Sequence, residues 1–512
     1  ATALIDGSNI NGTIPTQFYA FQLSETDRVQ LEVVHDAGRT TVEYQPELFT
    51  QTKPILQGET ATNEPVREGF NTTATCSYGC DDCVEVYPSS GELAVDQQLL
   101  KIPGRGDLNF QIDMIYRSKV QGPFGGWNWA YQECIEEQEG GDVVRYDGLG
   151  HLRTWEYNGD GTYTAPDGYF GTLLKKGDDT FILRQPDGFK RFYDARGRLM
   201  EYRDRYHNQM QFAYDERGRM DYILDPYERR VDVLYEVNSD NIIGIRDFCG
   251  RTVGFEYDAN GNLIETISPT ITGTSTGNDF PLGRRTQYTY TSGHSGETAF
   301  LNGNLLSITQ PNEVANGGPP KYQFSYDEDP NSATFDCIIG YDQGGTNASG
   351  VEAGGSVSFE YSTLNVGEPM NQPELPRGKV LITERDGSQL EYFVNENNHH
   401  IITRRLTQGF RDDEPDYYET ISSFNKDGQL IRRIYPEGNE LHQTWGSGSR
   451  AAEGNLVEIR NVADEDRGGG EDLVTTFEHE PLFNQVRSMT DPRGNSLTYV
   501  PPIGIASPQR YT

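Results

Sequence analysis

Hydrophobic and polar residues alternate in several short stretches near the middle of the chain. Because successive side chains of a β-strand point to opposite faces, residues of one parity share a face. Polar residues such as Gln209, Gln211, Asp232 and Glu256 take the second face. The alternation therefore predicts half-buried strands, with the apolar sets Met210, Phe212 and Tyr214; Val231, Val233 and Tyr235; and Val253, Phe255 and Tyr257.

The last tyrosine of each stretch belongs to a repeat. Tyr193, Tyr214, Tyr235 and Tyr257 follow one another at intervals of 21, 21 and 22 residues. A second turn signal lies between these positions, at 225–228 and again at 246–250. Each unit therefore contains two turns and two strands, and self-similarity at a fixed period indicates a repeat architecture.

Each unit places a turn sequence, Tyr-Asp-x-x-Gly in its full form, directly after the strand. The Asp can bond its own backbone two residues on, and the Gly adopts a positive φ without strain. The Tyr ring packs on the sheet while its hydroxyl finds a polar partner. We interpret the motif as a structural hairpin turn rather than a catalytic group, with the residues Tyr193, Asp194, Gly197, Tyr214, Asp215, Gly218, Tyr235, Tyr257, Asp258 and Gly261.

These Tyr-Asp-x-x-Gly-Arg-Leu units resemble the YD, or Rhs, repeats of bacterial Rhs proteins, insecticidal toxin complexes and animal teneurins. A second resemblance lies upstream, where 90–93, 100–106, 116–118 and 122–127 are similar to the small domain that often precedes Rhs repeats in secreted bacterial proteins. Degenerate copies extend the repeat over roughly residues 140 to 500, and they include Tyr326-Asp327, Phe359-Glu360-Tyr361, Phe424-Asn425-Lys426-Asp427-Gly428, Tyr435-Pro436-Glu437-Gly438 and Asp491-Pro492-Arg493-Gly494.

The resemblance implies an all-β fold in which repeated antiparallel β-hairpins form a long spiralling sheet, a YD-repeat shell or part of one. The expected division is an unassigned small β-rich domain at 1-75, the Rhs-associated N-terminal domain at 76-140 and the repeat sheet at 141-512. Complete Rhs shells are generally longer and finish with a self-cleaving core and a variable toxin, whereas this chain stops at Thr512. Either the chain is a fragment or another subunit completes the sheet.

Composition and charge limit the classes of partner that the chain can bind. The hydrophobic share is 35% and the aromatic share 11%, with 30 Tyr and 23 Phe, so the core is expected to consist of Tyr and Phe. A shell wetted on both faces has a low apolar share. The net charge of −35 argues against nucleic acid as a partner, since phosphate recognition relies on Lys and Arg. No apolar run approaches the roughly 20 residues that span a bilayer, so we expect no membrane insertion.

Cys76, Cys80 and Cys83 form a close group that could contain a disulfide in an oxidising compartment. The same spacing occurs in the iron–sulfur motif of radical S-adenosylmethionine enzymes, but nothing here alternates strand and helix as that resemblance would require. A small zinc site is a further alternative, for which the sequence offers no clear fourth ligand nearby. We expect no cofactor.

The remaining motifs are better explained as loop residues than as catalytic or metal-binding residues. Arg105-Gly106-Asp107 reads as a turn within a glycine-rich stretch, and Ser295 does not fit a nucleophile elbow. The eight histidines show no metalloprotease spacing, and the acidic runs 327–329 and 464–466 lack the spacing of a calcium loop. Without an activated nucleophile or a metal constellation, we expect that the chain is not an enzyme.

Two functional hypotheses follow. The first is a non-enzymatic shell-forming segment of a secreted or cell-surface protein that encloses or presents a cargo, commonly a C-terminal toxin in the family. The second is a structural or adhesive extracellular protein, whose open sheets assemble with further copies into a filament or bind glycans or another cell-surface ligand through exposed Tyr and Trp. A carbohydrate-active enzyme with paired carboxylates is a weaker third hypothesis.

Overall fold

We describe the fold from a computed structural model of the chain. It describes residues 2–6, 29–35, 38–44, 70–71 and 82–499, except 107, 121–125, 276, 278, 345–353, 408, 410–411 and 464–469. The described part is almost entirely β-structure in four sheets, so the expected all-β fold of antiparallel hairpins is confirmed. The described helices are short: η3 (Ala130–Gln132), η4 (Gly296–Leu301), α1 (Pro311–Asn316) and α2 (Arg450–Glu453). None of them is long and apolar enough to cross a membrane.

Three small sheets precede the repeat region. The first has three strands, β1 (Thr2–Asp6), β2 (Val29–His35) and β3 (Gly38–Tyr44). The second has five, β4 (Phe70–Asn71), β5 (Asp82–Tyr87), β6 (Glu92–Ile102), β7 (Phe110–Arg117) and β8 (Trp127–Trp129), and we call it the N-terminal sheet. The third has four, β9 (Cys134–Glu137), β10 (Val143–Tyr146), β11 (Leu152–Tyr157) and β12 (Tyr163–Thr164). The expected division at residues 75 and 140 stays a prediction.

One sheet of 25 strands makes up the rest, and its strands pair in the order of the sequence. Every pair is antiparallel, which is the arrangement that repeated hairpins produce. The strands are β13 (Thr172–Lys175), β14 (Phe181–Arg184), β15 (Lys190–Tyr193), β16 (Leu199–Arg203), β17 (Gln209–Tyr214), β18 (Met220–Leu224), β19 (Arg230–Tyr235), β20 (Ile242–Arg246), β21 (Thr252–Tyr257), β22 (Leu263–Ile267), β23 (Arg285–Tyr290), β24 (Leu305–Thr309), β25 (Tyr322–Tyr326), β26 (Ile338–Gln343), β27 (Gly355–Thr363), β28 (Gly378–Thr383), β29 (Gln389–Val394), β30 (His400–Leu406), β31 (Tyr417–Phe424), β32 (Leu430–Ile434), β33 (Glu440–Trp445), β34 (Leu456–Val462), β35 (Leu473–His479), β36 (Val486–Thr490) and β37 (Ser496–Thr498).

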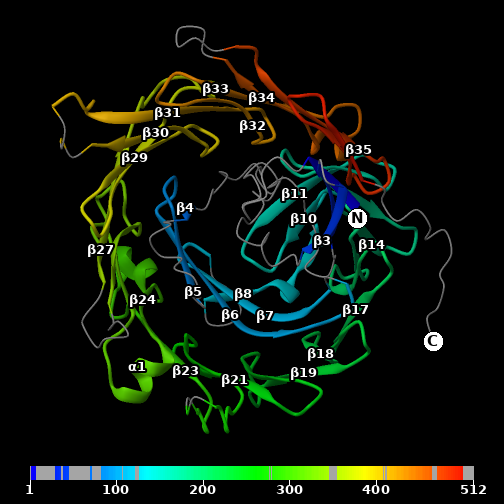
Figure 1. Ribbon diagram of the computed structural model, residues 1–512. Coiled ribbons are helices and arrows are strands. Elements are labelled where there is room, and N and C mark those ends of the chain that lie inside the picture. Colours follow the sequence, from blue (N-terminus) through cyan, green and yellow to red (C-terminus); the bar gives the residue numbers. More distant parts are fainter. Residues whose placement is uncertain are drawn as a thin grey trace.

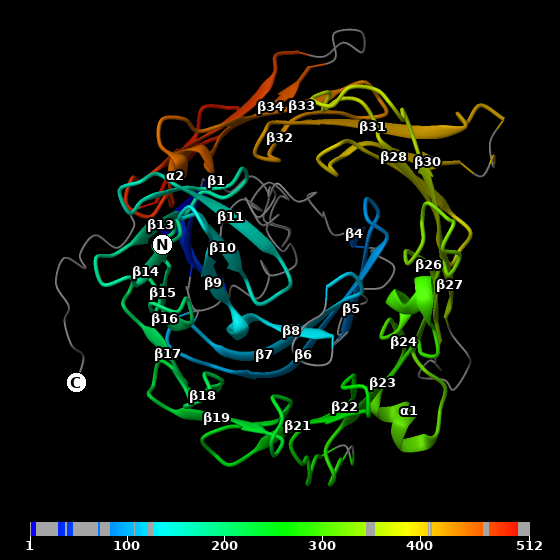
Figure 2. The same cartoon turned by 180° about the vertical axis from the view of Figure 1, so that it is seen from behind.

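The large sheet curves round until its last strands lie beside its first ones (Figure 1). The N-terminal sheet lies inside this curve, against the strands drawn in green, and β9 to β11 lie inside it next to β13 and β14 (Figure 2). The sheet therefore has an inner face, which the preceding sheets partly cover, and an outer face.

The curvature has a local cause in the repeat. The pairing register shifts by one residue next to Tyr193, Tyr214, Tyr235 and Tyr257. Such a β-bulge bends its strand and increases the local twist. The same shift recurs at every second strand from β23 to β35 except β27, so the bends accumulate along the sheet. The repeat period predicts the hairpins, and the structure adds that each of these hairpins bends beside its repeat tyrosine.

Burial follows the predicted alternation. On β17, Met210 and Phe212 are buried, whereas Gln209 and Gln211 are exposed. The same pattern recurs on β19 and β21, so the apolar parity of each strand forms the inner face. The expected core of Tyr and Phe is only partly correct, because most of the buried hydrophobic residues in the described part of the chain are aliphatic. The largest fully buried side chains are nevertheless mainly aromatic, including Trp127, Trp129, Trp155, Tyr116, Tyr193, Tyr322, Tyr341, Phe110 and Phe324.

Candidate functional site

The inner face of the large sheet is the first candidate surface, and the N-terminal sheet occupies part of it. The indole nitrogen of Trp127 donates to the hydroxyl of Tyr290 at 2.9 Å, and its ring lies 5.0 Å from that of Tyr288. The backbone nitrogen of Leu305 donates to the hydroxyl of Tyr116 at 2.9 Å. Tyr116, Trp127, Tyr288 and Leu305 belong to one buried cluster, and Tyr290 packs against it. The N-terminal sheet is therefore part of the same core as the large sheet.

A buried ionic cluster joins the small sheets to the first strands of the large one. Glu133, only 2% exposed, accepts hydrogen bonds from Arg145 Nε at 2.8 Å and from Arg191 Nε at 3.0 Å. The hydroxyl of Tyr202 donates to the same carboxylate at 3.0 Å, and that of Tyr193 does so as well. Burial alone would raise the pKa of Glu133, but the two guanidinium groups outweigh it and lower the pKa. Glu133 is therefore ionised and fixed in place.

Sequence reasoning missed this cluster. Its members come from β10, β15, β16 and the segment before β9, and no local spacing connects them. The available signal was a single acidic residue, Glu133, within the aromatic-rich stretch 127–135. A carboxylate in such a stretch is buried only when it is paired, so it points to basic partners elsewhere in the chain.

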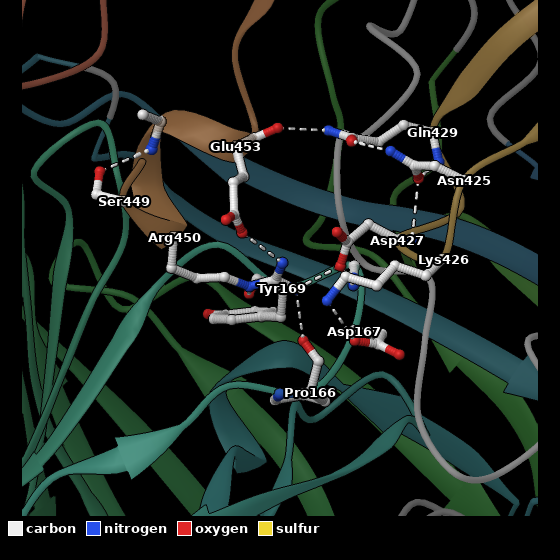
Figure 3. A network of polar contacts seen from close by, with 12 residues as sticks. Pro166, Asp167, Tyr169, Asn425, Lys426, Asp427, Gln429, Ser449, Arg450 and Glu453 are labelled. Atoms are coloured by element: carbon white, nitrogen blue, oxygen red, sulfur yellow. Dashed lines mark hydrogen bonds and ion pairs between the residues drawn. The ribbon is translucent and has the colours of Figure 1, made fainter. Parts of the chain in front are cut away.

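The second candidate is the seam where the two ends of the large sheet meet, and Arg450 on α2 lies at its centre (Figure 3). Arg450 donates to the backbone oxygens of Pro166 and Tyr169, both at 3.0 Å. It also binds the carboxylate of Asp427 at 2.6 Å, and Asp427 in turn accepts from the backbone nitrogen of Gly168 at 2.8 Å. One arginine and one aspartate thus hold the segment before β13 against loops near the other end of the sheet.

Electrostatics at the seam favour the ionised pair. Burial raises the pKa of Asp427, but the hydrogen bonds from Arg450 and Gly168 outweigh burial, and the pKa lies below its ordinary value. The two side chains are 6% and 22% exposed, so water screens this pair only partly. A second ion pair across the seam, Lys426 with Asp167 at 3.5 Å, is exposed and weak.

Contacts further along the seam are also made by side chains. Arg184 donates to the backbone oxygen of Leu482 at 3.0 Å, and Asn484 donates to that of Pro186 at 3.4 Å. Within the described ranges, every hydrogen bond across the seam involves a side chain, whereas neighbouring strands elsewhere are joined by backbone ladders. The seam is therefore chemically different from the rest of the ring.

The predicted turn residues lie where β15, β17, β19 and β21 end, on the same side of the large sheet. Their side chains bind the protein's own backbone or core. The hydroxyl groups of Tyr214, Tyr235 and Tyr257 donate to backbone oxygens at the start of the preceding strand at 2.7, 3.0 and 2.7 Å. Burial raises the pKa of each of these tyrosines, to about 12 for Tyr235. Tyr193 differs, since it donates to Glu133.

The aspartates of the turns bond their own backbone. Asp194, Asp215 and Asp258 each accept from the backbone nitrogens two and four residues later, at 2.8–2.9 Å. The glycines that follow them have positive φ angles: Gly197 at 77°, Gly218 at 84° and Gly261 at 85°.

Other sequence candidates are dispersed. Cys76, Cys80, Asp107 and the run 464–466 lie outside the described residues, as does the side chain of Cys83. Asp327 binds Thr334 of its own loop at 2.6 Å. In the part of the chain that the structure describes, no group of three or more His, Cys, Asp or Glu side chains could hold a metal ion.

Comparisons with known proteins find no matching family model and no matching curated protein. Among solved structures, the chain is similar to a crystal structure of TcdB2-TccC3-Cdc42, with 11% identity over 80% of this chain and a TM-score of 0.37. It is also similar to the Photorhabdus luminescens Tc holotoxin pore, with 12% identity over 80% of this chain and a TM-score of 0.37. A third similar structure is the crystal structure of TcdB2-TccC3-TEV, with 10% identity over 84% of this chain and a TM-score of 0.36. This chain spans 22–24% of the length of those chains. With scores this low, the similarity does not decide the function of this chain.

Proposed function

We propose that the chain is a non-enzymatic shell segment that encloses or presents a polypeptide cargo. The observation that supports this most is the closure of the large sheet, which curves until the loops around Asp427 and Arg450 bind the segment before its first strand. A sheet that closes on itself separates an interior space from the surrounding solvent.

The inner face changes character along the sheet, which supports a cargo-facing region. Ile382, Leu390, Arg405 and Tyr418 lie opposite one another on successive strands, so they share one face. Ile382 is fully buried, whereas Arg405 is exposed and Tyr418 is 39% exposed. We infer that the later strands present a polar, accessible inner surface to a cargo.

The resemblance of the repeat to YD and Rhs repeats supplies the finer part of the proposal. In that family the shell commonly holds a toxin, and its members are secreted or displayed on the cell surface. Toxin cargo and an extracellular location are therefore proposed for this chain as well.

The test is protease protection of the cargo. The tagged full chain is purified from the cells that produce it, treated with protease, and the surviving polypeptides are identified by mass spectrometry. We expect a second polypeptide that survives with the native shell and is digested in Arg450→Met, because this variant breaks the seam.

Lys426→Met is the matched control, since Lys426 makes only the exposed ion pair at the same seam. It should protect the cargo as the wild type does. If no second polypeptide survives in the wild type, or if Arg450→Met protects it equally well, the enclosing role is wrong.

A further inference from the structure

Three buried hydrogen-bond donors lie close together without an acceptor. In the described part of the chain, Nη1 of Arg145, Nη1 of Arg191 and the hydroxyl of Tyr169 have no hydrogen-bond partner. Arg145 is 2% exposed, Tyr169 is 3% exposed and the side chain of Arg191 is 15% exposed. An unpaired buried polar group carries a substantial penalty, so three in one place need an explanation.

The three groups are neighbours. Arg145 and Arg191 bind the two different oxygens of the Glu133 carboxylate, which brings their guanidinium groups together. The ring centroid of Tyr169 lies 5.9 Å from the Arg145 guanidinium carbon, and Tyr169 also interacts electrostatically with Arg191. The donors come from β10, from β15 and from the segment between β12 and β13.

Charge at this place is unbalanced. Arg145 and Arg191 share the carboxylate of Glu133. The guanidinium of Arg153, 5.7 Å from the Tyr169 ring, is paired with the buried Asp147 at 3.8 Å. Three guanidinium groups therefore face two carboxylates, which leaves one positive charge in excess in a buried position. The walls are aromatic: Trp155 packs on Tyr169 with 4.9 Å between ring centroids, and the Arg191 guanidinium lies 5.5 Å from the ring of Tyr202. A buried charge without a partner is unfavourable in such surroundings.

We propose that a small monovalent anion of the size of chloride binds between Arg145, Arg191 and Tyr169. Such an anion accepts several N–H and O–H donors at once and balances the single positive charge. A water molecule would accept hydrogen bonds but bring no charge. Phosphate or sulfate would bring up to two negative charges and require more space between the aromatic walls.

The bound anion would stabilise the seam indirectly, through Tyr169. Arg450 binds the backbone oxygens of Pro166 and Tyr169, and the anion holds the hydroxyl of the same Tyr169. Anion binding therefore stabilises the segment on which ring closure depends. This inference concerns the closed ring and does not depend on any cargo.

The test is the stability of the full chain in sodium bromide, with sodium gluconate replacing it at constant ionic strength. Constant ionic strength keeps the screening of the −35 net charge unchanged. Above the dissociation constant, the equilibrium constant for unfolding should fall about tenfold for each tenfold rise in bromide. Crystals grown in bromide should show anomalous density between Arg145 and Arg191.

Two conservative variants make the test specific. Tyr169→Phe removes one donor, and about fivefold more bromide should then be needed for the same effect, because one hydrogen bond is lost. Tyr163→Phe is the control: its hydroxyl is also buried without a partner, but its electrostatic neighbours are Glu137 and Lys175. Bromide dependence that is absent in the wild type, or equal in both variants, would overturn the site, as would a water molecule at this position in the crystals.

Discussion

Replacing Glu133 with glutamine tests how the small sheets are attached to the large one. The substitution preserves shape but removes the charge that Arg145 and Arg191 share. Breaking a buried ion pair from one side typically costs about 3–5 kcal/mol, because the remaining charge is left uncompensated. With Glu133 and Arg145 both 2% exposed, we expect Glu133→Gln to lower the free energy of unfolding by about 3–5 kcal/mol.

The assay is urea denaturation followed by tryptophan fluorescence. Three of the four tryptophans, Trp127, Trp129 and Trp155, are buried within or beside the small sheets, so the signal reports on this part of the fold. Glu137→Gln is the control, since the Glu137 side chain is 43% exposed and pairs with Lys175. An exposed pair of this kind contributes about 1 kcal/mol or less.

The comparison of the two variants is decisive. If Glu133→Gln and Glu137→Gln destabilise the protein by the same amount, within about 1 kcal/mol, then the buried cluster does not hold the sheets together as described. A loss of stability without any change in the tryptophan signal of the folded state is part of the expected result.

Three further predictions concern the turns, the buried histidine and the seam. Gly197→Ala should cost about 1–3 kcal/mol more than Gly261→Ala in thermal denaturation, because a Cβ at 197 would overlap the backbone oxygen of Ile135 while the space at 261 is open; equal costs would contradict the docking of this turn. Burial lowers the pKa of His399 to about 4 from 6.5. Between these two pKa values the unfolded chain binds more protons than the folded chain, so the free energy of unfolding rises with pH. The contribution of this histidine is fully present above about pH 6.5, and about 3 kcal/mol of it is lost as the pH falls toward 4. Melting temperatures at several pH values should fall less steeply in His399→Gln, and an unchanged slope would refute the assignment. Arg450→Met should increase amide hydrogen exchange in residues 167–170 by about 5- to 150-fold, since loss of a partly buried ion pair costs about 1–3 kcal/mol. Exchange as in Lys426→Met would contradict the role of the seam.

The local part of the fold was predictable from the sequence. The parity of residues such as Phe212 and Val233 predicted strands and their buried face, because alternation is fixed by the geometry of a single strand. The 21-residue period predicted consecutive hairpins, because each repeat unit contains two strands and two turns. The bulge beside each repeat tyrosine was not visible, since it depends on pairing with the next strand.

The candidate sites were beyond sequence reasoning. Arg450 reaches Pro166 across 284 positions of the chain, and this contact exists only because the bends of many strands add up to a closed ring. Glu133 likewise meets Arg191 only after the small sheets have docked inside the curve. No periodicity within either segment encodes such meetings, so composition and motifs could not reveal them.

The closure of the sheet by a single chain is best tested by cryo-electron microscopy of the purified protein, with the particle mass measured by light scattering. The account predicts discrete particles in which one chain of 57.5 kDa forms a curved shell, with the small sheets inside and the loops around Arg450 touching the segment before β13. Open sheets whose ends stay apart, or filaments in which the last strand pairs with a neighbouring copy, would contradict it.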